Sequence, residues 1–123
     1  MKKSIYAFLI TFLTGLSLSG YGQQLKKSIP AAVKYGNNPK AGKYLATRGI
    51  KLYYEIYGQG KPLLMIHGNG GSLANFKYQI PYFAKHYKVI AVDSRAQGKS
   101  VDSSSTLNYE MMADDMKALM PCI

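Results

Sequence analysis

The sequence contains one cysteine, no tryptophan, and only six acidic residues against sixteen lysines and arginines. A single cysteine excludes an internal disulfide framework and a metal site built from several thiolates. A hydrophobic content of 47% excludes a disordered tail, because such a chain can bury enough apolar surface to offset its ordering entropy. Its 123 residues suffice for one ordinary domain and are too few for two.

The net charge of +10 is spread along the chain rather than concentrated. No basic run exceeds two residues (Lys2–Lys3 and Lys26–Lys27), and aromatic residues do not alternate with these runs. Nucleic-acid-binding proteins normally gather lysines and arginines into one patch or stripe. We therefore interpret the charge as a solvated basic surface and expect no nucleic-acid partner.

The first residues are typical of an export signal. A short basic start precedes an apolar run over Ile5–Leu13, which is shorter than the roughly 20 residues of a membrane helix. Small residues at Gly20 and Gly22 suit a cut before Gln23. We predict a signal peptide over residues 1–22 and an exported, periplasmic or extracellular protein with no stable membrane span after cleavage. An uncut membrane anchor is the alternative.

The rest of the chain divides into a polar leader or linker over residues 23–43 and an ordered part over residues 44–123. Two strands joined by a tight turn are predicted at Tyr44–Thr47 and Ile50–Tyr57. Apolar runs without alternation predict strands covered on both faces, as in a parallel sheet flanked by helices. These two runs are Leu63–Ile66 and Lys88–Val92.

Helical spacing appears after each of the two apolar strands. Leu73, Phe76 and Ile80 are spaced for one face, and Pro81 suits the first turn of a second short helix through Tyr87. A later helix is predicted from about Thr106 to Met120. Its apolar stripe consists of Tyr109, Met112, Met116 and Leu119, with Glu110, Asp114, Asp115 and Lys117 off the stripe. The element order favours an α/β sheet.

A glycine-rich turn, His67–Ser72, follows the first apolar strand directly. Such a turn places backbone N–H groups at the carboxyl edge of a sheet, where they can cradle a phosphate or hold an oxyanion. A dinucleotide site is one interpretation, with Asp93 as the acid that binds the ribose. However, Leu73 occupies the place of the third glycine of G-x-G-x-x-G, and a hairpin precedes the glycine strand.

Three features in order resemble the α/β-hydrolase family: His67–Ser72, the loop Asp93–Ser100, and the helix Tyr109–Leu119. The second is similar to the family's D-x-R-G-x-G-x-S loop, with Ala96 in the first glycine position. The resemblance implies an α/β fold in which residues 44–123 form the N-terminal part of an α/β-hydrolase sheet. This part is a strand hairpin followed by strand, helix, strand and helix, and the sheet is incomplete.

The resemblance also implies roles for particular residues. The oxyanion loop would comprise His67, Gly68, Asn69 and Gly70, with the Asn69 backbone N–H as a donor and His67 orienting the loop rather than acting as base. The second loop would be held in shape by Asp93, Arg95, Gly98 and Ser100. A serine-type hydrolase of this family would cleave an ester-like or amide-like bond in a small-molecule substrate. It implies no cofactor and no metal.

The sequence contains no G-x-S-x-G nucleophile motif. The nearest match, Gly70–Ala74, lies in the glycine-rich turn, and we interpret Ser72 there as a helix N-cap. In the family, the nucleophile strand follows the helix that ends here near Met120 and pairs beside Leu63–Ile66. We therefore expect a fragment that lacks nucleophile, acid and base, is inactive alone, and offers an apolar sheet edge to a partner strand or chain. The alternative is an exported, non-catalytic binding module acting through its tyrosine-rich surface.

Overall fold

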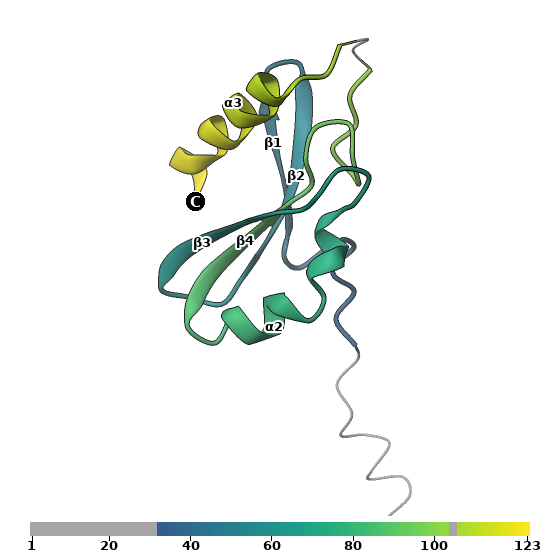
Figure 1. The fold of residues 1–123 in the computed structure, drawn as a ribbon. Helices are drawn as coiled ribbons and strands as arrows, with labels where there is room; N and C mark the ends of the chain where they lie inside the picture. Colours follow the sequence, from purple (N-terminus) through teal and green to yellow (C-terminus); the bar gives the residue numbers. More distant parts are fainter. Residues whose placement is uncertain (1–31, 104–105) are drawn as a thin grey trace, which may run out of the picture. The chain divides into compact units, whose positions relative to one another are not determined.

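Four strands pair into one mixed sheet in the order β1-β2-β4-β3 (Figure 1). The strands are β1 (Gly42–Thr47), β2 (Ile50–Tyr57), β3 (Lys61–Ile66) and β4 (Tyr87–Val92). β2 runs antiparallel to both β1 and β4, whereas β3 and β4 are parallel. The computed structural model describes residues 32–103 and 106–123, so the predicted signal peptide over residues 1–22 lies outside the described residues. The mixed sheet and its edge strand β3 agree with the predicted fold.

The β1–β2 hairpin closes through the two residues Arg48 and Gly49. Both have positive φ angles, +45° and +82°. This combination belongs to the tight turns whose twist matches a hairpin. Strand β1 begins at Gly42, two residues earlier than predicted.

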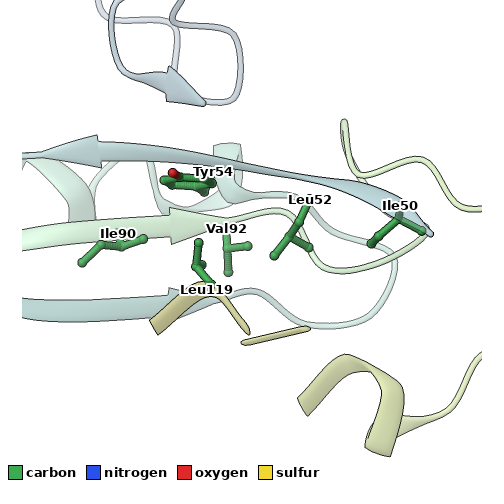
Figure 2. Close-up of a cluster of buried hydrophobic side chains, with 6 residues drawn as sticks. All are labelled: Ile50, Leu52, Tyr54, Ile90, Val92 and Leu119. Carbon is green, nitrogen blue, oxygen red and sulfur yellow. The ribbon is translucent and has the colours of Figure 1, made fainter. Parts of the chain in front are cut away.

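Side chains of the two central strands, β2 and β4, point alternately to the two faces of the sheet and pack into a separate core on each face. Helix α3 (Tyr109–Leu119) covers one face, and Figure 2 shows its Leu119 beside the side chains of β2 and β4. The 3-10 turn η1 (Leu73–Phe76) and helix α2 (Gln79–Phe83) cover the other face. The first core contains Ile50, Leu52, Tyr54, Ile90, Val92 and Leu119; the second contains Tyr53, Leu73, Ile80, Val89 and Ala91.

The helices are shorter than the sequence pattern predicted. Helix α2 ends at Phe83 rather than near Tyr87, which already belongs to β4. Helix α3 begins at Tyr109, since the side chain of Asn108 accepts a hydrogen bond from the Met111 N–H at 2.8 Å and caps the helix. A short 3-10 turn, η2 (Met120–Cys122), follows α3. None of the helices in the described part of the chain is long and apolar enough to span a membrane.

The predicted apolar stripe of α3 is wrong at two positions. Tyr109, placed on the stripe, is 83% exposed, whereas Asp115, placed off it, is fully buried. Leu119 is buried in the first core as predicted. The helix therefore faces the sheet with an acid among its apolar residues, and this acid has a partner described below.

A buried carboxylate ties the segment before β1 to the sheet. Glu55 is fully buried and accepts hydrogen bonds from the backbone N–H groups of Gly36 and Asn38, each at 2.9 Å. It also accepts from the hydroxyls of Tyr53 at 2.7 Å and Tyr57 at 2.8 Å. Burial, reinforced by the bond to Glu55, raises the pKa of both tyrosines, so each remains a donor. The part of the predicted linker from Val33 onward thus lies within a compact unit, Val33–Ile123.

We expect Glu55→Gln to lower the free energy of unfolding by about 2–4 kcal/mol. All four groups around this side chain are donors, and the NH₂ group of glutamine cannot accept a hydrogen bond from them. The control Tyr57→Phe removes only one of the four donors and is expected to cost about 1 kcal/mol. Urea unfolding of the three proteins measures both values. Equal midpoints for Glu55→Gln and the unaltered chain would contradict this role.

Candidate functional site

The glycine-rich turn and the loop after β4 meet at one edge of the sheet. Because β3 and β4 are parallel and Ile66 pairs with Val92, both strands deliver their following loops to the same side. The Gly70 N–H donates to the side-chain oxygen of Gln97 at 2.6 Å, and the Leu73 N–H donates to Asp93 Oδ1 at 2.7 Å. Two segments about 25 residues apart in sequence therefore form one structural site.

His67 connects the two loops through both of its ring nitrogens. Its Nδ1 lies 2.8 Å from the carbonyl oxygen of Gly68, and its Nε2 accepts from the Ser94 N–H at 3.1 Å. A carbonyl can only accept, so Nδ1 carries the proton and the ring is neutral. With the Nε2 lone pair engaged and the residue only 8% exposed, His67 shapes the turn and has no free nitrogen to act as a base.

Asp93 uses both carboxylate oxygens to shape the loops. Oδ1 accepts from Leu73, as above, and Oδ2 accepts from the Lys99 N–H at 2.7 Å. Ser72 occupies the N-cap position of η1 as predicted, but its side chain makes no cap bond. The Asp93 carboxylate accepts from the first N–H of η1 instead. Asp93 is only 1% exposed and both of its oxygens already accept backbone N–H groups, an arrangement that serves the loops rather than a ribose.

In the second loop, Asp93–Ser100, the local geometry restricts which residues can occupy several positions. Gly98 has φ +55°, and a Cβ there would collide with the Asp93 carboxylate. Ser100 Oγ accepts from the Tyr53 N–H at 2.8 Å and donates to the Asp93 carbonyl at 2.7 Å. Ala96, which occupies the first glycine position of the family motif, has φ +61°, a region that side chains other than glycine enter at a cost.

Arg95 anchors the loop to α3. Its guanidinium donates from Nε and Nη2 to the two oxygens of Asp115, at 2.7 and 2.8 Å, and from Nη1 to Asp102 at 3.0 Å. Arg95 and Asp115 are 2% and 0% exposed, and the hydrogen bonds to Asp115 raise the pKa of the guanidinium. Sequence reasoning placed Arg95 correctly in the loop but missed Asp115. A buried arginine needs a buried acid, yet Glu110, Asp114 and Asp115 are equal candidates in sequence.

We expect Asp115→Asn to lower the free energy of unfolding by about 3–5 kcal/mol, because it leaves a buried guanidinium without its main counter-charge. Its neighbour provides a matched control. Asp114 pairs with Arg48 at 3.3 Å in a half-exposed ion pair, so Asp114→Asn should change stability by less than about 0.5 kcal/mol. Thermal and urea unfolding of both variants provide the comparison, and similar losses for the two would refute the assignment.

A hollow of about 780 Å³ opens between the glycine-rich turn and α3. Gly68 and Asn69 line it on one side, and Met112 and Met116 line it on the other. Within residues 32–103 and 106–123, no atom accepts a hydrogen bond from the Asn69 N–H. The hydroxyl of Ser94, which also lines the hollow, is buried and has no partner among the described residues. The hollow thus combines an apolar wall with unused donors at the sheet edge.

The orphaned hydroxyl of Ser94 leads to a stability prediction. We expect Ser94→Ala to leave the stability unchanged or to raise it by up to about 1 kcal/mol, since it removes a buried polar group without a partner. Ser100→Ala is the matched control, and it should cost about 1–3 kcal/mol because it leaves the Tyr53 N–H unsatisfied. Differential scanning calorimetry of the two variants tests this contrast. A Ser94→Ala protein as destabilised as Ser100→Ala would show that the hydroxyl has a partner.

The remaining reactive side chains do not assemble into a second site. His86 is exposed in the turn between α2 and β4. Cys122 is exposed, and its thiol lies 3.9 Å from the Ala118 carbonyl oxygen. In the part of the chain that the structure describes, no group of three or more histidine, cysteine or acidic residues could hold a metal ion.

Comparison with known proteins identifies the family to which these loops belong. The profile of the alpha/beta hydrolase fold family matches residues 61–122, half of the chain, from the start of β3 to the end of η2. The chain belongs to the alpha/beta hydrolase fold family. The stated resemblance and the fold class predicted with it are therefore confirmed.

Three relatives illustrate the match. The AB hydrolase superfamily protein YisY of Bacillus subtilis (strain 168) is 33% identical over 81 residues, 64% of this chain and 30% of that protein. The (E)-2-((N-methylformamido)methylene)succinate hydrolase of Acinetobacter baylyi is 46% identical over 62 residues, 50% of this chain and 24% of that protein. A solved structure of a meta-cleavage product hydrolase (CumD) from Pseudomonas fluorescens IP01 is 31% identical, with a TM-score of 0.57 over 68% of this chain and 32% of that one. This 123-residue chain therefore spans less than a third of the length of each of these three relatives.

Proposed function

We propose that this chain supplies the oxyanion-binding part of a serine-type hydrolase that cleaves an ester-like or amide-like bond in a small molecule. The observation that carries the proposal is the Asn69 N–H, which has no acceptor within the described residues and lies on a loop that borders the hollow. A preorganised backbone donor of this kind stabilises the negative charge that develops on a carbonyl oxygen during acyl transfer. That the named relatives are hydrolases supports the same chemistry.

The rigidity of the loop supports the role of Asn69. The residue before it, Gly68, is held by His67, and the residue after it, Gly70, is held by Gln97. A donor that is fixed before the reaction needs no reorganisation when charge develops, which is where such sites gain their rate. The apolar wall of Met112 and Met116 would exclude water from the charge and strengthen its interaction with the donor.

The 123 residues alone lack the other groups that the reaction needs. The sequence contains no G-x-S-x-G, and His67 has both ring nitrogens engaged. Without nucleophile and base, an oxyanion loop leaves only a residual rate. We therefore propose that the chain by itself is inactive, that no cofactor or metal takes part, and that the free edge of β3 accepts the strand of a partner segment or chain. Export through the segment 1–22 belongs to the same proposal.

The test replaces the 62 matching residues of the Acinetobacter baylyi hydrolase with the residues of this chain aligned to them, and measures ester and amide hydrolysis. We expect an active chimera in which Asn69→Pro, which removes the N–H, lowers kcat by about 10²–10³-fold with little change in KM. Asn69→Ala keeps the N–H and should retain most of the rate. The unfused 123-residue chain should not react with a fluorophosphonate serine probe.

Three results would contradict the proposal. One is a chimera that unfolds cooperatively but hydrolyses neither class of bond. Another is equal rates for Asn69→Pro and Asn69→Ala at matched folded fractions. The third is labelling of the unfused chain by the probe, which would show that it carries its own activated nucleophile.

A further inference from the structure

The segment that covers the second core carries aromatic rings and lysines on its outer side. Tyr78, Tyr82 and Tyr87 are 74%, 65% and 38% exposed. Tyr78 and Tyr82 lie four residues apart, which places them on the same side of α2. The opposite side of this segment is apolar and buried, with Leu73 and Ile80 fully covered in the second core. The outward rings are therefore not needed for packing against the sheet.

Lysines accompany these tyrosines, and acidic residues do not. Lys77 and Lys85 are exposed, and residues 56–92 contain no aspartate or glutamate. Four of the chain's six acids are buried or nearly so: Glu55, Asp93 and Asp115 within the fold, and Asp102 with a side chain 6% exposed. The two exposed acids, Glu110 and Asp114, both lie on α3, which covers the other face of the sheet.

The rings are held in place by contacts with their neighbours. The Lys77 ammonium lies 4.9 Å from the centroid of the Tyr78 ring. The rings of Tyr82 and Phe83 meet edge to face at 5.1 Å between centroids, and those of Phe83 and Tyr87 at 6.3 Å. A surface that is already ordered loses little side-chain entropy when it binds.

The chemistry of this surface suits the boundary between water and lipid. Tyrosine combines an apolar ring with a polar hydroxyl and favours the headgroup level of a bilayer, and lysines near the surface are attracted to anionic headgroups. None of these side chains lines the hollow beside the candidate site or a second hollow of about 1030 Å³ beside the β1–β2 turn. Rings and lysines that project from a helix suit contact with an extended surface.

We propose that this tyrosine–lysine face, formed by Tyr78, Tyr82, Tyr87, Lys77 and Lys85, binds anionic lipid surfaces. The binding is peripheral, with tyrosine rings among the headgroups and lysines against lipid phosphates. The face is built on η1, α2 and the start of β4, whereas the candidate hydrolase site lies at the opposite, carboxyl end of β4. The proposal therefore does not depend on the proposed function.

The experiment measures binding of the full chain to vesicles of phosphatidylcholine alone and of equal parts phosphatidylcholine and phosphatidylglycerol. We expect the unaltered chain to prefer the anionic vesicles. Lys77→Gln/Lys85→Gln should bind them roughly thirtyfold more weakly, because it removes two lysines that each have the usual attraction to an anionic surface. The control Lys43→Gln/Lys117→Gln removes the same charge from β1 and α3 and should change binding by less than about threefold. Tyr78→Ser/Tyr82→Ser should weaken binding to both kinds of vesicle, and Tyr109→Ser on α3 should not.

A local probe separates this face from the apolar segment 1–22, which is present in every variant. In a Cys122→Ser background, an environment-sensitive dye is attached at Gln79→Cys or at Lys117→Cys. Binding through the proposed face shifts the emission of the dye at position 79 to the blue and leaves that at position 117 unchanged. A dye at position 79 that remains in water while the chain is bound to vesicles would overturn the proposal.

A nucleic acid is the rival partner, and the same variants distinguish it. The full chain should bind a single-stranded oligonucleotide no more tightly in the unaltered form than in Lys77→Gln/Lys85→Gln. Oligonucleotide binding that depends on these two lysines, together with no preference for anionic vesicles, would assign the face to nucleic acid and overturn the proposal. Circular dichroism melts check that each variant keeps its fold.

Discussion

The buried contact between Arg95 and Asp115 joins the loop after β4 to the helix that covers one face of the sheet. Without it, α3 would rest on the sheet through Leu119, the partly buried Met116 and the half-exposed ion pair with Arg48. The same loop contains Asp93, whose carboxylate supports the start of η1 on the other face. Both cores and both loops of the candidate site therefore depend on one short stretch, Asp93–Ser100, whose polar groups are satisfied almost entirely by the protein itself. The cost of burying these charges is offset because the two Asp93 oxygens and the Arg95 guanidinium have well-placed partners.

The distribution of acids inside the fold also determines the character of the outside. Because buried carboxylates hold the loops and the segment before β1, few remain to balance the lysines in solvent. A net charge of +10 thus becomes a surface that is more strongly basic than composition suggests.

Most of the sheet could be predicted from sequence because its signals are local. The Arg48–Gly49 turn, the unbroken apolar runs of β3 and β4, and the glycine-rich turn each lie within a few residues, and their order matches the family. The burial of Asp115 could not be predicted in this way, because its partner Arg95 lies 20 residues earlier and the helix offers three acids. Glu55 is a similar case, since its donors come from residues 36 and 38, in a segment with no regular pattern. The hydrogen bonds of His67 and Asp93 depend on the parallel pairing of β3 with β4, which the individual strands do not reveal.

The pairing order of the sheet has a consequence for the chain as it is synthesised. The hairpin β1–β2 and the donors to Glu55 lie within residues 36–57, so this part can close as soon as it leaves the ribosome. Strand β3 comes next, but its only partner in the described sheet is β4, and 20 residues separate the end of β3 from the start of β4. During that interval Leu63–Ile66 is an apolar strand with neither edge paired, the form most prone to wrong association. The lysine and proline that begin β3, Lys61 and Pro62, are the kind of residues that discourage such pairing, and they emerge before the apolar part does.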